Sequence, residues 1–480
     1  MTIQMQFLVA ALLFIISWHS SAQTTFQRTF GGSGYDYGRS VQQTSDGGYV
    51  VVGTTSSFWP FRLKVYLIKT NVAGDTLWTK SFGGSRSAQG YSVQETNDGG
   101  YIITGDTDSF GTGTSDVYLI KTNANGDTLW TRTYGGSWQD NGFSVRQTRD
   151  GGYVVAGLTN SFTAGSSDAY LIRTNATGDT LWTRSFGGSN YEEGRCVRQT
   201  SDGGYVMTGL QSFGTSGWRV WLIKTNASGD TIWTRTFGNS NYYDSGSSVE
   251  QTTDGGYVIA GTDMLIPGPV WAYLIRTDSI GNELWSKRFS REASGNPSAQ
   301  QTNDGGYVVA TSLSYSGNFD VYLAKMNAAG DTMWTRTIGG SGYDDAWSVQ
   351  QTIDGGYVIA GSTSSFGAGQ YDVYLIKTNA NGVVTAPKEL STPRSFALEN
   401  NYPNPFNPST RIGFEVLTTS FVSLKVFNVL GQEIAGLVNE VKQAGKHEVT
   451  WNASGQASGV YCCRLQADGF ATTKKLILVR

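Results

Sequence analysis

The stretch SVQETNDGGYIITGDTDSFGTGTSDVYLIKTNANGDTLWTRTYGG, residues 92–136, decides the fold because the chain repeats it. Its DGGY motif begins at seven positions, which are Asp46, Asp98, Asp150, Asp202, Asp254, Asp304 and Asp354. Successive copies begin 52, 52, 52, 52, 50 and 50 residues apart. A fixed period of this length is typical of proteins that stack one supersecondary unit many times.

Each repeat contains four short runs rich in β-branched and aromatic residues, whose commonest forms are SVQQT, GYVVVG, VYLIKT and TLWTRTFGG. The segments DGG and NANGD separate the runs and supply glycine where a tight hairpin needs a positive φ. The runs are apolar at consecutive positions, as in a sheet that is covered on both faces. One repeat therefore predicts one four-stranded sheet packed between its neighbours.

The two ends of the repeat array complement each other. The seventh repeat has a third run at residues 373–378, but NANGVVTAPKEL follows it in place of the fourth run. A copy of the fourth run stands at the other end, because FQRTFGG (residues 26–32) matches WTKSFGG (residues 78–84). Pairing the termini would remove exposed sheet edges. We therefore predict an all-β, seven-bladed β-propeller over residues 23–384, with the N-terminal strand closing the last blade.

Other segments flank this array. Residues 1–22 resemble a secretory signal peptide, with an apolar run and small residues before a cleavage site between Ala22 and Gln23. A membrane anchor is the alternative, but the apolar run is shorter than the roughly 20 residues that span a bilayer. Two prolines mark a linker over residues 385–398. Six short β-like runs then predict a small β-sandwich over residues 399–480.

Composition excludes several functions. The net charge of −3 gives no basic field for nucleic acid or an anionic membrane. The only cysteines are Cys196, Cys462 and Cys463, and neighbouring strand residues face opposite ways, so we expect no disulfide framework. The only histidines are His19 and His447, which is too few for a zinc site or histidine-based catalysis. We expect neither metal nor cofactor, and calcium bound by the polar turns is the alternative.

The motifs YPNPFNPSTRIGFEV (residues 402–416), VSLKVFNVLGQEI, GVYCCRL and KKLILVR follow one another in the last 80 residues. In this order they resemble the C-terminal sorting domain of proteins exported by the bacterial type IX secretion system. The resemblance implies an immunoglobulin-like sandwich, recognition by the secretion machinery, and a secreted or outer-membrane surface location reached through the periplasm. Asn404, Pro405, Lys474 and Lys475 are the candidate sorting residues. The repeats themselves look like propeller-type repeats of Bacteroidetes surface proteins.

Positions that recur in every repeat are most simply structural. The Asp of DGGY and the Asn and Asp of TNANGDT are expected to accept hydrogen bonds from turn amides. A cation ends the third run of each repeat, and we expect a hairpin partner, such as Asp127 for Lys121. The Trp of each TLWT segment is expected to lie in the core.

The connections between and within repeats place functional candidates on one rim of the predicted propeller, because there the sequence differs in each blade. The aromatic candidates for a ligand face are Tyr35, Trp59, Trp138, Tyr191, Tyr242, Tyr243, Trp271 and Tyr343. The acids among them are Asp36, Asp140, Glu192, Glu193, Asp244, Asp344 and Asp345. Aromatic rings beside hydrogen-bonding acids suit sugar or peptide ligands.

Three functions from different classes fit this pattern. The first is an exported binding or adhesion protein whose rim takes a carbohydrate or protein ligand. The second is a structural scaffold without a discrete ligand. The third is a glycoside hydrolase or polysaccharide lyase, which would need two carboxyl groups converging in a central pocket. The acids recur as part of the repeat, and no blade carries a singular cluster of acid, base and cation, so the sequence favours binding over catalysis.

Overall fold

The computed structural model describes residues 23–58, 62–163, 165–239, 242–265, 268–315, 318–385, 397–398, 401–416, 420–442, 445–467 and 470–479. The predicted signal peptide and Trp59 lie outside these residues. The regular secondary structure of the described residues is β-strand, apart from one short 3-10 helix, η1 (Gly214–Ser216). None of its helices is long and apolar enough to cross a membrane.

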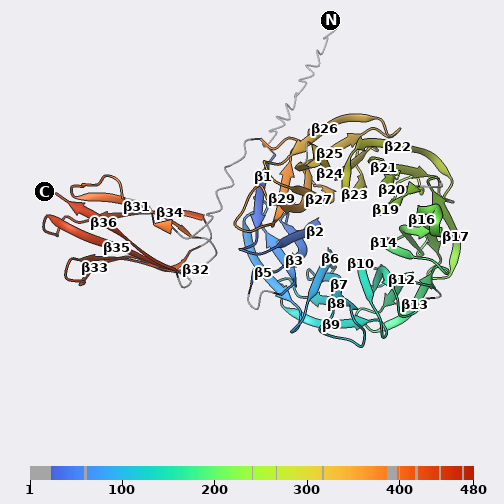
Figure 1. Ribbon diagram of the computed structural model, residues 1–480, viewed down its shortest axis with the longest axis horizontal. Coiled ribbons are helices and arrows are strands. Elements are labelled where there is room, and N and C mark those ends of the chain that lie inside the picture. The colour runs from blue at the N-terminus through green and yellow to red at the C-terminus, as the bar shows by residue number, and fades with distance from the viewer. Residues whose placement is uncertain are drawn as a thin grey trace, which may run out of the picture.

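Seven antiparallel sheets form the N-terminal part, and Figure 1 shows them arranged around a common centre. We name them in chain order from the first (β2–β5) to the sixth (β23–β26) and the seventh (β27–β29 with β1). The strands nearest the centre are β2 (Asp36–Gln43), β6 (Ala88–Glu95), β10 (Asp140–Gln147), β14 (Glu192–Gln199), β19 (Ser245–Gln251), β23 (Ala293–Gln301) and β27 (Asp344–Gln351).

The middle strands of each sheet are its most buried part, since neighbouring sheets cover both faces. The second strands are β3 (Tyr49–Thr55), β7 (Tyr101–Thr107), β11 (Tyr153–Thr159), β15 (Tyr205–Ser212), β20 (Tyr257–Met264), β24 (Tyr307–Tyr315) and β28 (Tyr357–Thr363). The third strands are β4 (Lys64–Thr70), β8 (Asp116–Thr122), β12 (Asp168–Thr174), β16 (Gly217–Thr225), β21 (Val270–Thr277), β25 (Asn318–Met326) and β29 (Asp372–Thr378).

Most outermost strands alternate between exposed and half-buried residues, because only one face packs against protein, whereas β1 is buried at Phe26 and Phe30. They are β5 (Thr76–Phe82), β9 (Thr128–Tyr134), β13 (Thr180–Phe186), β17 (Thr231–Phe237), β22 (Glu283–Arg291), β26 (Thr332–Ile338) and β1 (Phe26–Phe30). A short extra strand, β18 (Tyr242–Tyr243), pairs with β16 in the fourth sheet.

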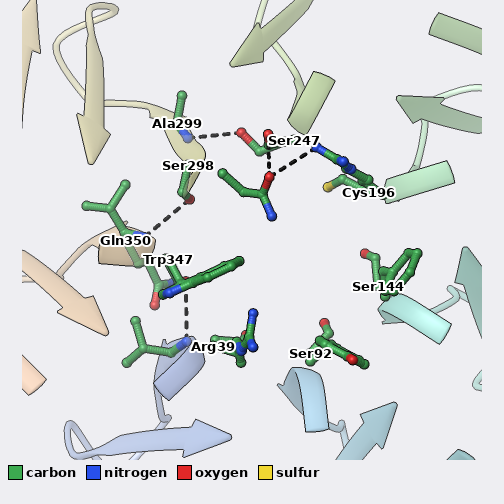
Figure 2. A pocket seen from close by; sticks show the side chains of 18 of the residues that line it. Arg39, Ser92, Ser144, Cys196, Ser247, Ser298, Ala299, Trp347 and Gln350 are labelled. Atoms are coloured by element: carbon green, nitrogen blue, oxygen red, sulfur yellow. Dashed lines mark hydrogen bonds between the residues drawn. The ribbon is translucent and has the colours of Figure 1, made fainter. Parts of the chain in front are cut away.

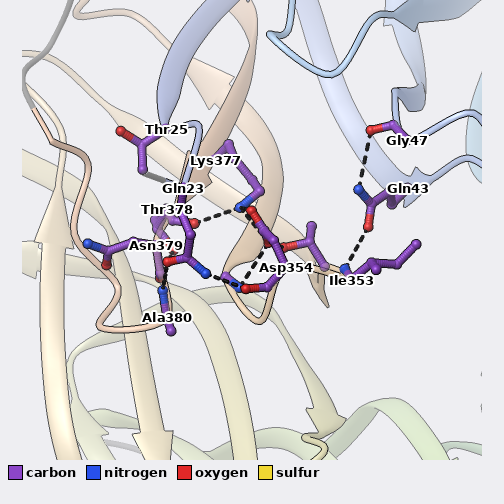
Figure 3. Close-up of polar contacts among 12 residues, drawn as sticks. Gln23, Thr25, Gln43, Gly47, Ile353, Asp354, Lys377, Thr378, Asn379 and Ala380 are labelled. Atoms are coloured by element: carbon purple, nitrogen blue, oxygen red, sulfur yellow. Dashed lines mark hydrogen bonds and ion pairs between the residues drawn. The ribbon is translucent and has the colours of Figure 1, made fainter. Parts of the chain in front are cut away.

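The two ends of the repeat array meet in the seventh sheet. Strand β1 pairs antiparallel with β29 from Phe26, opposite Lys377, to Phe30, opposite Val373, as the sequence predicts. Figure 3 shows that Gln23 extends this contact: its Oε1 accepts a hydrogen bond from the Ala380 N–H at 2.9 Å, and its Nε2 donates to the Asp354 carbonyl. The N-terminal residues thus occupy the place of the fourth run that the seventh repeat lacks.

The C-terminal unit contains two further sheets. One comprises β30 (Ala397–Leu398), β31 (Ser409–Val416) and β34 (Gly445–Asn452), and the other comprises β33 (Glu433–Lys442), β32 (Ser420–Asn428), β35 (Gly459–Ala467) and β36 (Phe470–Leu478). Phe414, Leu424, Trp451 and Leu465 belong to one buried cluster, to which both sheets contribute. Cys463 also lies in this cluster, and all three cysteines of the chain are free thiols.

Two expectations about recurring residues are wrong. Lys121 pairs with Asp98 of the DGGY turn at 2.9 Å, because the buried end of β8 lies under that turn, whereas Asp127 faces the neighbouring sheet and pairs with Lys80. The Trp side chains of the outermost strands are half-buried instead of lying in the core. Trp78 packs edge-on against Tyr101 of the next sheet, with ring centroids 5.8 Å apart. These residues seal the outer seam between sheets.

Candidate functional site

Each innermost strand carries a β-bulge near its middle. In β2 the register shifts between Gly38 and Ser40, so that Arg39 has no partner residue on β3. The same shift occurs in β6, β10, β14, β19 and β27, and a longer irregularity occupies β23. A bulge re-aims the side chain of its extra residue. The repeat therefore presents one re-aimed side chain from each sheet.

These bulged positions line a central cavity of about 490 Å³. They differ in chemistry from sheet to sheet: Arg39, Tyr91, Phe143, Arg195, Ser247, Asn296 and Trp347. Figure 2 shows Arg39 and Trp347 reaching into the same space from neighbouring strands. The Arg39 guanidinium carbon lies 4.0 Å from the Trp347 ring centroid, a cation–π contact. The cavity combines aromatic surface with a few polar groups, as ligand sites commonly do.

The cavity carries more positive than negative side chains. Its lining includes Arg39, Arg146, Arg195 and Arg198 but only two acids, Glu193 and Glu250. Glu193 forms an ion pair with Arg195 and accepts a hydrogen bond from the Tyr191 hydroxyl at 2.7 Å. Burial raises the pKa of Glu250, although the charges of the two arginines nearby oppose that shift. An anionic group is therefore the better electrostatic match for the cavity.

Sequence reasoning missed this cavity. The predicted functional residues lie in the connecting loops, where the sequence varies most. The bulged residue instead lies inside a strand, between recurring glycine and serine positions. A signal was present, because the residue before Ser of the SVQQT run changes from Arg to Tyr, Phe, Ser and Trp between repeats. The sequence could not show that this side chain points into the cavity, because the regular alternation of side chains along a strand would point it elsewhere.

The rim aromatics that the sequence singled out form small local pairs. Tyr35 stacks on Tyr371 of the seventh sheet, and Tyr343 stacks on Phe319, with ring centroids 6.2 and 5.4 Å apart. Tyr191 and Tyr243 both contact Trp218, and Arg288 lies over Tyr242. Trp271 is half-buried on β21, and Trp138 is the most exposed of the described candidates, at 64%. Several of these rings therefore hold adjacent sheets together.

Most acids of the same rim are buried beneath it, in contrast to the expectation of a mixed ligand face on the surface, and of these buried acids Glu193 contacts a candidate aromatic, Tyr191. All except Asp345 are buried: Asp36, Asp140, Glu192, Glu193, Asp244 and Asp344. Asp36 and Asp140 accept hydrogen bonds from the Gly32 and Gly136 N–H groups at 2.9 Å. The acid at the head of an inner strand thus anchors the preceding loop.

Several of these acids face a second carboxylate. Asp36 Oδ2 and Asp372 Oδ1 lie 2.4 and 2.2 Å from the point where a Cβ on Gly31 would stand, so only glycine fits there. Burial, reinforced by the charge of Asp36, raises the pKa of Asp372 to about 6. Burial and the charge of Asp263 raise the pKa of Asp244 to about 7. These carboxyls lie under the loops, outside the central cavity.

The opposite rim is uniform, and its DGGY aspartates and turn asparagines accept backbone amides as the sequence predicts, whereas the Asp127 carboxylate accepts from the Asn123 and Lys80 side chains. Asp98 Oδ1 accepts the Gly100 N–H at 3.1 Å, and Asn123 Oδ1 accepts the Asp127 N–H at 2.9 Å. Burial alone would raise the pKa of Asp98, but hydrogen bonds from Thr96 and Lys121 outweigh it and lower the pKa to about 2. Within the described ranges, no group of three or more His, Cys, Asp or Glu side chains could hold a metal ion.

The structure brings the candidate sorting residues to one strand. The Asn404 side chain accepts a hydrogen bond from the Ile477 N–H at 3.0 Å and donates to the Lys475 carbonyl at 3.3 Å. Asn404, Pro405 and Lys475 are exposed, and Lys474 is half-buried. The segment around Pro405 therefore lies along β36, beside the two lysines.

Comparison with known proteins identifies the C-terminal unit. The family model described as the secretion system C-terminal sorting domain matches residues 400–479. Residues 400–479 are a type IX secretion sorting domain. The chain is therefore an exported protein of the cell surface or the surroundings, and its sorting domain is the part that interacts with the type IX secretion machinery.

The other comparisons give one relative and several solved structures. Regulatory protein FlaEY of Caulobacter vibrioides is 28% identical over 176 residues, which cover 31% of this chain and 18% of that protein. Among solved structures, PorZ, a surface component of the Porphyromonas gingivalis type IX system, has a TM-score of 0.45 and 13% identity, covering 94% of this chain and 60% of that one. The Pan2 WD40 domain of Neurospora crassa has a TM-score of 0.46 and 7% identity, covering 74% of this chain and 97% of that one.

Proposed function

We propose that residues 23–384 form a closed, seven-bladed β-propeller and that the C-terminal sandwich is immunoglobulin-like. The junction between the seventh and first sheets supports closure, because it uses the same bonds as the other junctions. The Val41 N–H donates to Ser348 Oγ at 3.3 Å, as the Val145 N–H does to Ser92 Oγ. Arg28 of β1 likewise pairs with Asp75 of the first sheet. The first and last blades therefore contact each other as successive blades do.

On this framework, the exported protein is a binding or adhesion protein whose propeller takes a carbohydrate or protein ligand in its central cavity. The observation that carries this proposal is the variety of the bulged positions. Positions around them recur in order to maintain the fold, whereas Arg39, Tyr91, Phe143 and Trp347 point different chemistry into one cavity. A scaffold without a ligand has no need of such variety at positions with no partner on the neighbouring strand.

Binding explains the cavity better than catalysis does. Its two acids are already engaged, since Glu193 pairs with Arg195 and Glu250 Oε2 accepts the Gln301 N–H at 2.8 Å. The carboxyl groups that do face each other, such as Asp36 and Asp372, are buried under the loops. Glycoside hydrolysis needs two carboxyl groups that both reach the substrate.

A glycan array probed with the mature chain, residues 23–480, tests the proposal. We expect Trp347→Ala to abolish binding of the glycans that the wild type recognises, because it removes an aromatic wall of the cavity. Trp138→Ala is the matched control, since it removes the same side chain from the exposed rim. Loss of binding in the Trp138 variant alone would place the ligand on the rim. Failure of the wild type to bind any glycan would exclude a carbohydrate ligand.

We also propose that Asn404, Pro405, Lys474 and Lys475 form the surface that the secretion machinery recognises. Their shared position along β36 supports this. Replacing Lys474 and Lys475 by Ala should leave the full-length chain in the periplasm, as measured by fractionation. Lys425→Ala, which removes a half-buried lysine elsewhere on the same domain, is the control. Unchanged export of the double variant would contradict the assignment.

A further inference from the structure

The sheets are joined around the cavity by a repeated hydrogen bond near the inner strand ends. A glutamine or glutamate side chain of one inner strand accepts the backbone N–H of the next inner strand. The bond occurs at five junctions: Gln42 with Glu95, Gln94 with Gln147, Glu250 with Gln301, Gln300 with Gln351, and Gln350 with Gln43, all at 2.7 or 2.8 Å. Each of these bonds gives an acceptor to a strand-edge donor that faces the centre.

Two successive junctions break this pattern. Arg146 on β10 and Arg198 on β14 occupy the glutamine position, and arginine has no acceptor to offer. The N–H groups in the corresponding places belong to Gln199 and Gln251. Among the hydrogen bonds of the described residues, none gives either N–H a side-chain acceptor. The other junctions pair a backbone donor with a side-chain acceptor. These two junctions instead place a guanidinium donor beside a backbone donor.

No carboxylate of the described residues forms an ion pair with either arginine, although the charge of Glu250 acts on both. Arg146 Nη1 donates to the Val145 carbonyl at 2.8 Å, and Arg198 Nη1 donates to the Val197 carbonyl at 3.0 Å. Neither takes part in any ion pair of the described chain. Burial, with the charge of Arg198 as the next cause, lowers the pKa of Arg146 to about 9. Both side chains line the cavity, so their unused donors are accessible from it.

The same sector departs from the repeat in a second way. At six junctions a serine Oγ accepts an inner-strand N–H, but at the seventh the position holds Cys196, whose thiol contacts the Val249 carbonyl at 3.8 Å. Arg198 Nη1 lies 3.3 Å from Cys196 Sγ. The departures thus cluster on the β10–β14–β19 side of the cavity. Selection for the fold alone would favour the residues that the other repeats use.

We propose that Arg146 and Arg198 form an oxyanion subsite of the central cavity, which binds the carboxylate or sulfate group of an acidic carbohydrate. The inference rests on the proposed binding function and names its ligand class. A planar guanidinium gives paired, charge-assisted hydrogen bonds to such a group. The aromatic residues at the bulged positions, Tyr91, Phe143 and Trp347, supply surface for the sugar rings. An acidic peptide offers the same carboxylate but has no sugar ring for this surface.

The repeat supplies conservative variants for the test. Arg146→Gln with Arg198→Gln introduces the residue that four other repeats already carry, which should restore the junction hydrogen bonds and preserve the fold. Arg132→Gln with Arg184→Gln is the matched control, because it removes the same two charges from exposed outer strands. Glu250→Gln removes a negative charge from the same sector and should strengthen anion binding.

The first measurement is the melting temperature of the mature chain in sodium sulfate and in sodium chloride of equal ionic strength. We expect sulfate to raise the melting temperature of the wild type and of the outer-strand control more than chloride does. The Arg146/Arg198 variant should lose this difference between the two salts. Equal effects of sulfate on all three proteins would overturn the subsite. This readout requires no knowledge of the natural ligand.

The second measurement is calorimetry with trigalacturonate, a sulfated galactan trisaccharide, neutral galactotriose and a hexaglutamate peptide. We expect one acidic sugar to bind about 10- to 100-fold more weakly to the Arg146/Arg198 variant, through loss of charge-assisted hydrogen bonds. The preference between the two acidic sugars distinguishes carboxylate from sulfate. Neutral sugar binding as tightly as acidic sugar would overturn the subsite but leave the proposed function. Binding of the peptide alone would overturn the carbohydrate assignment. No binding with no sulfate effect would overturn the subsite, whereas the proposed binding function is tested separately by the glycan array.

Discussion

The acidic residues of the two rims have opposite environments. On the uniform rim, each DGGY aspartate meets a cation from the end of the third strand, as Asp98 meets Lys121 at 2.9 Å. On the variable rim, acids such as Asp244 and Asp372 lie buried near other carboxylates. The first arrangement keeps carboxylates ionised and fixes the repeat. The second makes the protonation state of the loop anchors depend on pH.

The largest effect should come from breaking the uniform rim. Asp98→Ala leaves the Lys121 ammonium buried without its counter-ion, and we expect a loss of about 3 kcal/mol in the free energy of unfolding. Urea denaturation of the purified chain measures this. Asp127→Ala is the control, because the two aspartates are similarly exposed but Lys80 is 37% exposed and Lys121 only 4%, so little change should follow. Equal losses in both variants would contradict the contrast between buried and exposed pairs.

The next effect is a pH dependence of opposite sign on the two rims. The pKa of Asp244 rises to about 7 on folding, so its contribution to stability is complete below pH 4 and is lost as the pH rises through 7. The pKa of Asp98 falls to about 2, so its contribution is present above pH 4 and is lost as the pH falls toward 2.

Asp244→Asn tests that sign. We expect the wild type to lose about 2 kcal/mol of stability between pH 5 and pH 8 through this group, and the variant to lose less. Urea denaturation at several pH values measures the slope. A variant slope as steep as that of the wild type would remove Asp244 as the cause.

A smaller effect separates the outer seam from the variable rim. Trp78→Ala should destabilise the protein by between about 1 and 2 kcal/mol, because its half-buried ring packs against Tyr101 of the next sheet. Trp138→Ala should change stability little, since its ring is 64% exposed. Thermal unfolding of both variants makes the comparison, and a larger loss for Trp138 would show that the rim ring has a structural role.

The smallest effect concerns the serine ring around the cavity. Cys196→Ser should raise stability by less than about 1 kcal/mol, because serine can accept the strand N–H as it does at the other junctions. The reciprocal change, Ser144→Cys, should lower it by a similar amount. Paired melting temperatures measure both, and a loss in each variant would show that Cys196 is adapted to its own junction.

The sequence alone determined the repeat, the hairpin turns, the pairing of the N-terminal strand with the last repeat and the sorting domain. These features follow from local turn chemistry, from periodicity and from an ordered set of motifs, all of which are visible along the chain. The match of residues 26–32 to the missing fourth run is the clearest example, because strand pairing needs only a complementary segment.

Only the tertiary structure decided where the acids and the cavity residues point. The sequence predicts Asp36 as a loop acid, but its side chain is buried and accepts the Gly32 N–H. Lys121 pairs with Asp98 and not with Asp127, because the ends of strands from different hairpins meet there. Arg39 reaches the cavity because a bulge adds one residue to β2, and its neighbour Trp347 comes from the other end of the array. Side-chain direction at a bulge and contacts across a ring depend on three-dimensional packing, which the order of residues does not show.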